Sequence, residues 1–129
     1  MQYSDNPQFN AFVKAYITAM LWSTPGTDPA TGEEVEDLQA FELAAETVEQ
    51  VKLECHAFWK DAYTIMERLD ADGLHSFELS GHDFWLTRNG HGVGFWDRGL
   101  GNTGDVLTAM SKKAGSCDPY VGDDGKVYI

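Results

Sequence analysis

The chain has few cationic residues: nine Lys and Arg stand against 21 Asp and Glu, which gives a formal net charge of −12. Residues 28–54 alone hold nine acidic residues and one basic residue. Proteins that bind nucleic acids or anionic membranes usually carry a basic patch that displaces counterions from phosphates. We therefore expect no direct binding of nucleic acid or of membranes. An acidic surface suits a solubilised monomer, a partner with a basic face, or imitation of the phosphate backbone.

Cysteines are also scarce, and long apolar runs are missing. Cys55 and Cys117 are too few for a disulfide framework. The apolar run near the N-terminus is interrupted by Lys14, Tyr16 and Thr18, and no charged-then-apolar leader opens the chain. These features predict a protein of a reducing cytoplasm. In such a protein Cys55, on the apolar side of a helix, is expected to be a buried thiol.

The length of 129 residues and the apolar share of 43% predict one domain with a single core. Asn6-Pro7 is a helix start, with Asn as the N-cap and Pro at the first helical position. Apolar residues then recur at spacings of three and four, which predicts a helix of about four turns. The following segment, rich in Pro, Gly, Thr and Asp, predicts an exposed loop. The helix and this acidic loop make up residues 1–38.

A second, longer helix is predicted over residues 40–69, because apolar residues keep the three-four spacing along that range. Its start is weakly marked, and Ala44 is the alternative first position. On its outer face, Glu42, Glu46 and Glu49 occupy positions i, i+4 and i+7 and form an acidic stripe. Such a stripe is either a solvated face or a binding surface for a basic partner.

The dipeptide Asn89-Gly90 is the strongest short-range signal for a β-hairpin with a two-residue type I′ turn. We therefore predict a hairpin over residues 81–99. Trp85 and Trp96 lie on one face of it, where they either belong to the core or form an aromatic patch for a partner. On the opposite face the pairs are Arg88 with His91, Leu86 with Val93, Phe84 with Phe95, and His82 with Asp97.

Beyond this hairpin, Gly99-x-Gly101-x-x-Gly104 matches a dinucleotide-binding fingerprint in its letters, but the preceding strand belongs to a tight hairpin and not to a βαβ unit. We interpret these glycines as a turn into a short helix. Residues 120–129 alternate around an Asp-Gly turn, which predicts a second hairpin. Residues 81–129 are thus expected to form a hairpin, a helix and a second hairpin.

The expected fold class is α+β within a single domain. Two long helices pack on a small antiparallel sheet made of the two hairpins, and the short helix lies between the hairpins. No internal repeat indicates a second domain.

His82, Asp83, Asp97 and Arg98 place imidazole, carboxylate and guanidinium groups close together in the sequence. In the predicted register His82 faces Asp97, whereas Asp83 points to the other face and His91 lies at the far end of the strands. This separation disfavours a shared metal, and the spacing matches no zinc motif, so we expect no metal and no cofactor. The pair of His82 and Asp97 is interpreted as a cross-strand hydrogen bond. A catalytic or ligand-binding site at this end of the hairpin is the alternative.

The segment from His82 to Gly99, followed by Gly104-Asp105-x-Leu107 and by residues 120–125, resembles a family of small uncharacterised proteins encoded by bacteriophages and other bacterial mobile elements. The resemblance covers the chain well from His82 onward and extends weakly through the helix that holds Cys55. It implies a setting in the cytoplasm of a bacterial host. It carries over no catalytic residue.

The expected function is that of a non-enzymatic accessory protein that binds a host protein, with the acidic residues meeting a basic surface. This class includes inhibitors of host defence and proteins that imitate nucleic acids. The alternative is a small enzyme, or a ligand-binding or metal-binding domain, centred on the four polar residues at the open end of the hairpin. The expected binding residues are Glu42, Glu46, Glu49, Trp85 and Trp96.

Overall fold

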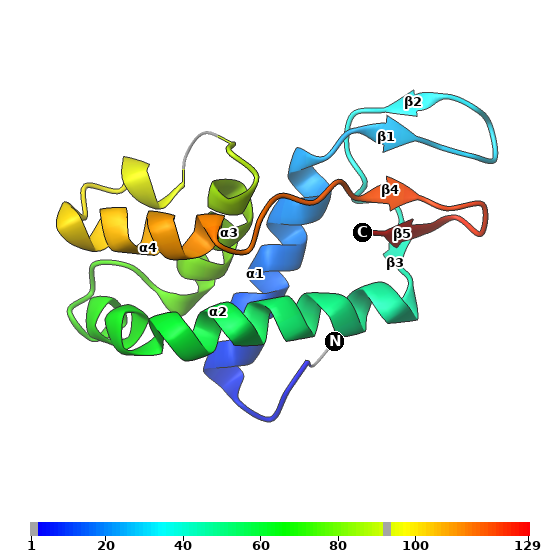
Figure 1. The fold of residues 1–129 in the computed structure, drawn as a ribbon. Coiled ribbons are helices and arrows are strands. Elements are labelled where there is room, and N and C mark those ends of the chain that lie inside the picture. The colour runs from blue at the N-terminus through cyan, green and yellow to red at the C-terminus, as the bar shows by residue number, and fades with distance from the viewer. Residues whose placement is uncertain (1–2, 92–93) are drawn as a thin grey trace.

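The protein has an α+β fold in which the strands gather at one end of a helical body (Figure 1). The computed structural model describes residues 3–91 and 94–129. Within them the helices are α1 (Pro7–Ser23), α2 (Ala45–Ala71), α3 (Phe77–Arg88) and α4 (Asn102–Lys112), and a short 3-10 helix, η1, covers Phe95–Asp97. The strands are β1 (Gly26–Thr27), β2 (Glu34–Val35), β3 (Glu42–Leu43), β4 (Tyr120–Val121) and β5 (Lys126–Tyr128). The expected α+β class is confirmed.

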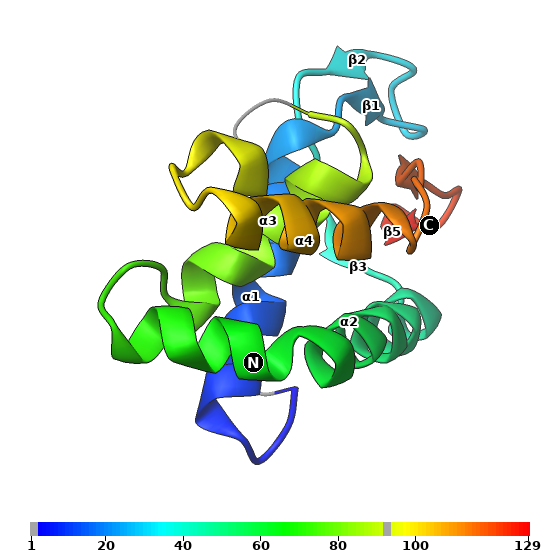
Figure 2. The ribbon, with the colours of Figure 1, turned by 60° about the vertical axis from the view of Figure 1, so that its left-hand side comes forward.

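The helices form the core. Figures 1 and 2 show α4 on the same side of the molecule as α2, with α1 crossing behind α2, and α1 packs mainly against α3. The predicted start of α1 is confirmed, because the side chain of Asn6 accepts hydrogen bonds from the backbone N–H groups of Gln8 and Phe9. Cys55 is buried, as expected. None of the described helices combines the length and the apolar character needed to cross a membrane.

Helix α2 begins later than residue 40, because the preceding residues form β3, which pairs in parallel with β5. The hydroxyl of Thr47 donates a 2.8 Å hydrogen bond to the carbonyl oxygen of Val127 in β5. Apolar spacing is a local signal, so it does not reveal pairing with a strand near the end of the chain. Glu42 lies in β3 and not on the helix. The predicted stripe of Glu42, Glu46 and Glu49 on one helical face is therefore wrong.

The predicted hairpin over residues 81–99 is also wrong, since its first half belongs to α3. Ser76 caps this helix, and its hydroxyl oxygen accepts a 3.0 Å hydrogen bond from the N–H of Leu79. The Asn-Gly pair ends the helix instead of turning a hairpin. Gly90 has a φ of 71°, a left-handed conformation that glycine adopts readily just after a helix.

The strand pairs of that hairpin are accordingly not formed. Phe84 and Phe95 are both buried, and both rings stack on Phe58, with centroids 4.1 and 6.1 Å away. Hydrophobic burial, and not strand pairing, brings them to the same part of the core. No ladder joins His82 to Asp97, Phe84 to Phe95 or Arg88 to His91 in the described residues, and the pair of Leu86 and Val93 lies outside them.

The second predicted hairpin is confirmed, because β4 and β5 pair in an antiparallel manner. They belong to a three-stranded sheet with the order β3-β5-β4. The loop predicted after α1 contains a separate hairpin of β1 and β2. One sheet built from two hairpins is therefore replaced by two small sheets. Figures 1 and 2 show both at the end of the molecule where α2 begins.

Gly81 allows the close contact between α1 and α3. A Cβ atom at this position would overlap the carbonyl oxygen of Phe12 in α1 and would lie 2.8 Å from its carbonyl carbon. Both atoms belong to the backbone, so a rotamer change cannot relieve the overlap. The missing side chain is what lets the two helices approach.

We expect Gly81→Ala to lower the free energy of unfolding by at least about 2 kcal/mol, because the added methyl group forces α1 and α3 apart. Alanine has a helix propensity about 1 kcal/mol more favourable than that of glycine, and the expected loss of about 2 kcal/mol already includes this gain. Denaturant unfolding followed by circular dichroism measures the change. Gly104→Ala is the matched control, since the nearest atom to its Cβ would be the carbonyl oxygen of Phe95 at 3.0 Å and the loss should be smaller. Equal stability of Gly81→Ala and the wild type would contradict this packing.

Candidate functional site

Asp83 in α3 is a fully buried carboxylate surrounded by basic side chains. Arg98 donates hydrogen bonds from Nε to Oδ2 at 2.9 Å and from Nη2 to Oδ1 at 2.8 Å. Nδ1 of His82 lies 3.1 Å from Oδ1. Nε2 of His75 lies 3.1 Å from Oδ2, within ion-pair range but without the alignment of a hydrogen bond. Both oxygens of the carboxylate are therefore occupied. We call these four residues the Asp83 cluster.

The Asp83 cluster joins three segments of the chain: His75 precedes α3, His82 and Asp83 belong to α3, and Arg98 follows η1. A buried charge is costly unless an opposite charge and hydrogen bonds compensate it, and the two-pronged contact of Arg98 meets both needs. The backbone N–H of Phe95 also donates a 3.1 Å hydrogen bond to Oγ1 of Thr87. Together these contacts hold η1 against α3.

The surroundings of Asp83 act on its pKa in opposite directions. Burial raises the pKa, but the contacts with His75, Arg98 and His82 and the charge of Arg98 outweigh it, so the pKa lies below its ordinary value. The hydrogen bond to Asp83 is the largest cause that raises the pKa of Arg98 above its usual range. Asp83 is thus an ionised carboxylate that has no role as a proton donor near neutral pH.

The structure brings together His82, Asp83 and Arg98, three of the four residues of the alternative site. Asp97 is exposed on η1, next to Arg98, and its charge contributes to the raised pKa of that residue. His75 was not among the expected site residues. The signal that could have placed it here is the helix start at Ser76, which sets His75 at the beginning of α3.

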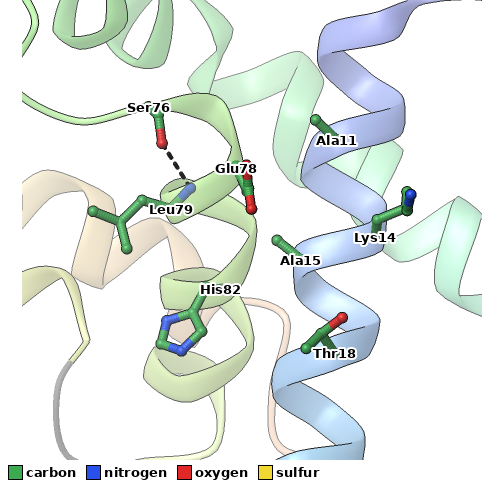
Figure 3. Close-up of a pocket in the computed structure, with 8 residues that line it drawn as sticks. All are labelled: Ala11, Lys14, Ala15, Thr18, Ser76, Glu78, Leu79 and His82. Carbon is green, nitrogen blue, oxygen red and sulfur yellow. Dashed lines mark hydrogen bonds between the residues drawn. The ribbon is translucent and has the colours of Figure 1, made fainter.

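A groove of about 600 Å³ opens beside His82, between α1 and α3 (Figure 3). His82 is half-buried, and because Asp83 holds its Nδ1, the remaining nitrogen Nε2 is the atom that can contact a ligand. Figure 3 shows Glu78 and His82 projecting from α3, and Lys14 and Thr18 projecting from α1. The other lining residues are Ala11, Ala15, Ser76 and Leu79.

The comparisons with known proteins give no family. No family model, curated protein or solved structure matches the chain. In residues 3–91 and 94–129, no group of three or more His, Cys, Asp or Glu side chains is placed to hold a metal ion. A function for this chain therefore has to be inferred from its own residues.

The chemistry of the Asp83 cluster favours a structural role. A catalytic histidine needs a group that orients it and a nucleophile or water that it activates. Asp83 orients His82, but Arg98 already neutralises that carboxylate. The hydroxyl oxygen of Ser76, which lines the same groove, is engaged in capping α3. His82 is therefore the solvent-accessible group on which an enzymatic function would depend. That alternative stays a prediction.

The two tryptophans expected to share a face do not have the same surroundings. Trp85 is 1% exposed, and its Nε1 donates a 2.7 Å hydrogen bond to Oγ of Ser23 at the end of α1. Trp96 is 41% exposed on η1. Trp85 belongs to the core because it lies on a helix face that α1 covers. Its assignment as a binding residue is therefore wrong.

The three expected acidic binding residues are exposed at the end of the molecule that holds the strands. Oε2 of Glu42 lies 3.6 Å from the amine of Lys126, and Oε1 of Glu49 lies 3.6 Å from the amine of Lys52. Both distances are long for exposed ion pairs, which contribute little to stability. Glu46 forms no ion pair with any described residue. All three carboxylates are therefore available to a partner.

Further carboxylates and two aromatic side chains lie at the same end. Trp22, near the end of α1, is 58% exposed, and Tyr120 in β4 is 55% exposed and stacks on Tyr128. We use the name acidic end for the surface formed by the exposed residues Glu33, Glu34, Glu36, Glu42, Glu46, Glu49, Asp123 and Asp124.

Proposed function

We propose that the protein acts by binding a partner protein that presents a basic surface. The observation that carries this proposal is the acidic end, where carboxylates from the β1–β2 hairpin, from β3, from the first turns of α2 and from the β4–β5 turn are exposed together. Few cations lie among them, so the surface keeps most of its negative charge. Complementary charge speeds association and selects between partners.

Exposed aromatic side chains at the acidic end support a protein partner. Trp22 and Tyr120 are large apolar groups in contact with solvent. Aromatic residues are enriched in the centre of protein interfaces, where they bury much area at a small entropic cost. A surface that only keeps a protein in solution has no need of them.

We further propose the setting that the family resemblance implies. In this setting the chain is an accessory protein of a bacteriophage or another mobile element, and it works in the cytoplasm of a bacterial host. The density of carboxylates supports a mode of action in which the acidic end occupies a basic site on a host protein, including a site that otherwise holds nucleic acid.

The Glu42→Gln, Glu46→Gln, Glu49→Gln triple variant is expected to lose its partner in affinity capture from a bacterial lysate, with the partner identified by mass spectrometry. Capture by the wild type should fall steeply between about 0.1 and 1 M salt, because the screening length drops from about 10 to about 3 Å. The control variant removes three charges elsewhere: Glu67→Gln, Asp70→Asn and Asp105→Asn. Recovery of the same partner by the triple variant at both salt concentrations would contradict the proposal.

A further inference from the structure

Two cavities lie end to end along α2 and share Glu54. The first has a volume of about 520 Å³ and lies between α2 and α4. The second has a volume of about 400 Å³ and lies between the first half of α2 and β5. The exposed or half-exposed α2 residues that line them, at spacings of three and four, are Glu46, Gln50, Glu54, Ala57 and Asp61.

This spacing places the lining residues on one face of α2, and we call the two adjoining cavities together the α2 groove. From residue 46 to residue 61 it extends about 22 Å at 1.5 Å per residue. Figure 1 shows α4 and the segment that follows it running beside α2 over this length. The opposite wall is formed by Met110, Lys113, Ala114, Cys117 and Tyr128.

The α2 groove is apolar in its middle part, and exposed carboxylates lie toward its two ends. Its opposite wall also carries the exposed cation of Lys113. Phe58 and Phe84, two stacked rings of the core, line the middle together with Ala57 and Met110. The carboxylate of Glu54 is already neutralised, since Oε1 accepts a 2.9 Å hydrogen bond from Nη2 of Arg88. Glu46 and Asp61, toward the two ends, are exposed and form no ion pair with any described residue.

We propose that the α2 groove binds an amphipathic, basic α-helix of the partner protein. This inference rests on the proposed function and names the element of the partner that is recognised. A helix in such a groove places apolar side chains at positions i, i+3, i+4 and i+7 against the floor. Its basic side chains then reach Glu46 at one end and Asp61 at the other. At 1.5 Å per residue, a helix of about 15 residues fills the groove.

A 15-residue peptide of Leu and Lys, with Leu at helical spacing, tests the proposal by fluorescence anisotropy with the full chain. Ala57→Trp fills the middle of the groove without a change of charge, and it should raise the dissociation constant at least about tenfold. Ala109→Trp adds the same side chain at an exposed position of α4 that does not line the groove, and it should leave binding unchanged. A scrambled peptide of the same composition should bind at least about tenfold more weakly.

Three outcomes would overturn the α2 groove as the docking site: equal binding of the two peptides, no effect of Ala57→Trp, or self-association of the chain that Ala57→Trp abolishes. The last outcome would mean that a second copy occupies the groove. The proposed function is judged separately, by capture with the triple glutamate variant. If that variant loses its partner while Ala57→Trp retains it, binding at the acidic end stands without the groove.

Discussion

Arg88→Met is expected to lower the free energy of unfolding by about 3–5 kcal/mol, the range for removing one member of a buried ion pair. The guanidinium of Arg88 is buried at the end of α3, where it lies 5.7 Å from the centre of the Phe84 ring and makes polar contacts with three other parts of the chain. Nη1 donates a 2.9 Å hydrogen bond to the hydroxyl of Tyr16, and Nη2 donates one of 2.9 Å to Glu54. Nε donates a 2.7 Å bond to the carbonyl oxygen of Gly115, and Nη2 a 2.9 Å bond to that of Ala114.

Methionine has a similar volume but no donor, so the variant leaves a carboxylate and two carbonyl groups without their partner. Arg88→Lys should also be destabilising, because a single ammonium group cannot reach acceptors on α1, α2 and the segment after α4 at once. Arg68→Met is the surface control. Its guanidinium lies 3.3 Å from Asp72 in an exposed pair, and its loss should cost less than about 1 kcal/mol. Denaturant unfolding of the three variants measures these losses of stability. Similar losses for Arg88→Met and Arg68→Met would contradict a structural role of Arg88.

Helix α3, which ends at Arg88, was not predicted from the sequence. The Asn-Gly pair that follows it is a strong hairpin signal, and the same pair also suits the end of a helix. In the structure Ser76 caps α3, and Phe77, Gly81, Phe84 and Arg88 point to the core from successive turns. Aromatic residues are frequent on both sides of the pair, and their density obscured this helical spacing.

The elements with one clear period were predicted correctly. Helix α1 has its cap at Asn6, α2 keeps the three-four spacing, and the short helix α4 follows the turn at Gly99 and Gly101 as expected. The turn at Gly125 fixes the β4–β5 hairpin. The strand β3 was not predicted, because two residues show no period and their partner lies near the other end of the chain.

Three residues of the Asp83 cluster were identified from the sequence, but their contacts were not. The sequence singled out His82, Asp83 and Arg98, but the strand register assigned His82 to Asp97 and turned Asp83 to the opposite face. On the helix, the buried carboxylate of Asp83 contacts both the neighbouring His82 and the more distant Arg98. A wrong local period therefore changed every partner while the residue types stayed correct. The α2 groove depends on packing between α2 and α4, which no local pattern reports.

Asp83→Asn is expected to lower the free energy of unfolding by about 3 kcal/mol at neutral pH, because it leaves Arg98 without its counter-charge in a mostly buried site. The amide keeps the shape of the carboxylate, so the loss reports charge and hydrogen bonding and not volume. The value is at the lower end of the range for buried pairs because Arg98 is partly in contact with solvent. Asp70→Asn, at an exposed position near the end of α2, should change the stability by less than about 0.5 kcal/mol.

The cost of Asp83→Asn should also depend on pH, with a sign that follows from the pKa of Asp83. Since this pKa lies below its ordinary value in the folded protein, the ionised carboxylate stabilises the fold at every pH above its unfolded-state pKa of about 3.9. As the pH falls below about 4 toward the folded-state pKa, the wild type loses this stabilisation, whereas the Asn variant has none to lose. Urea unfolding of both proteins from neutral to acidic pH should therefore show their stabilities converging in acid. A gap that stays constant through this range would mean that Asp83 is not held as a carboxylate by His75, His82 and Arg98.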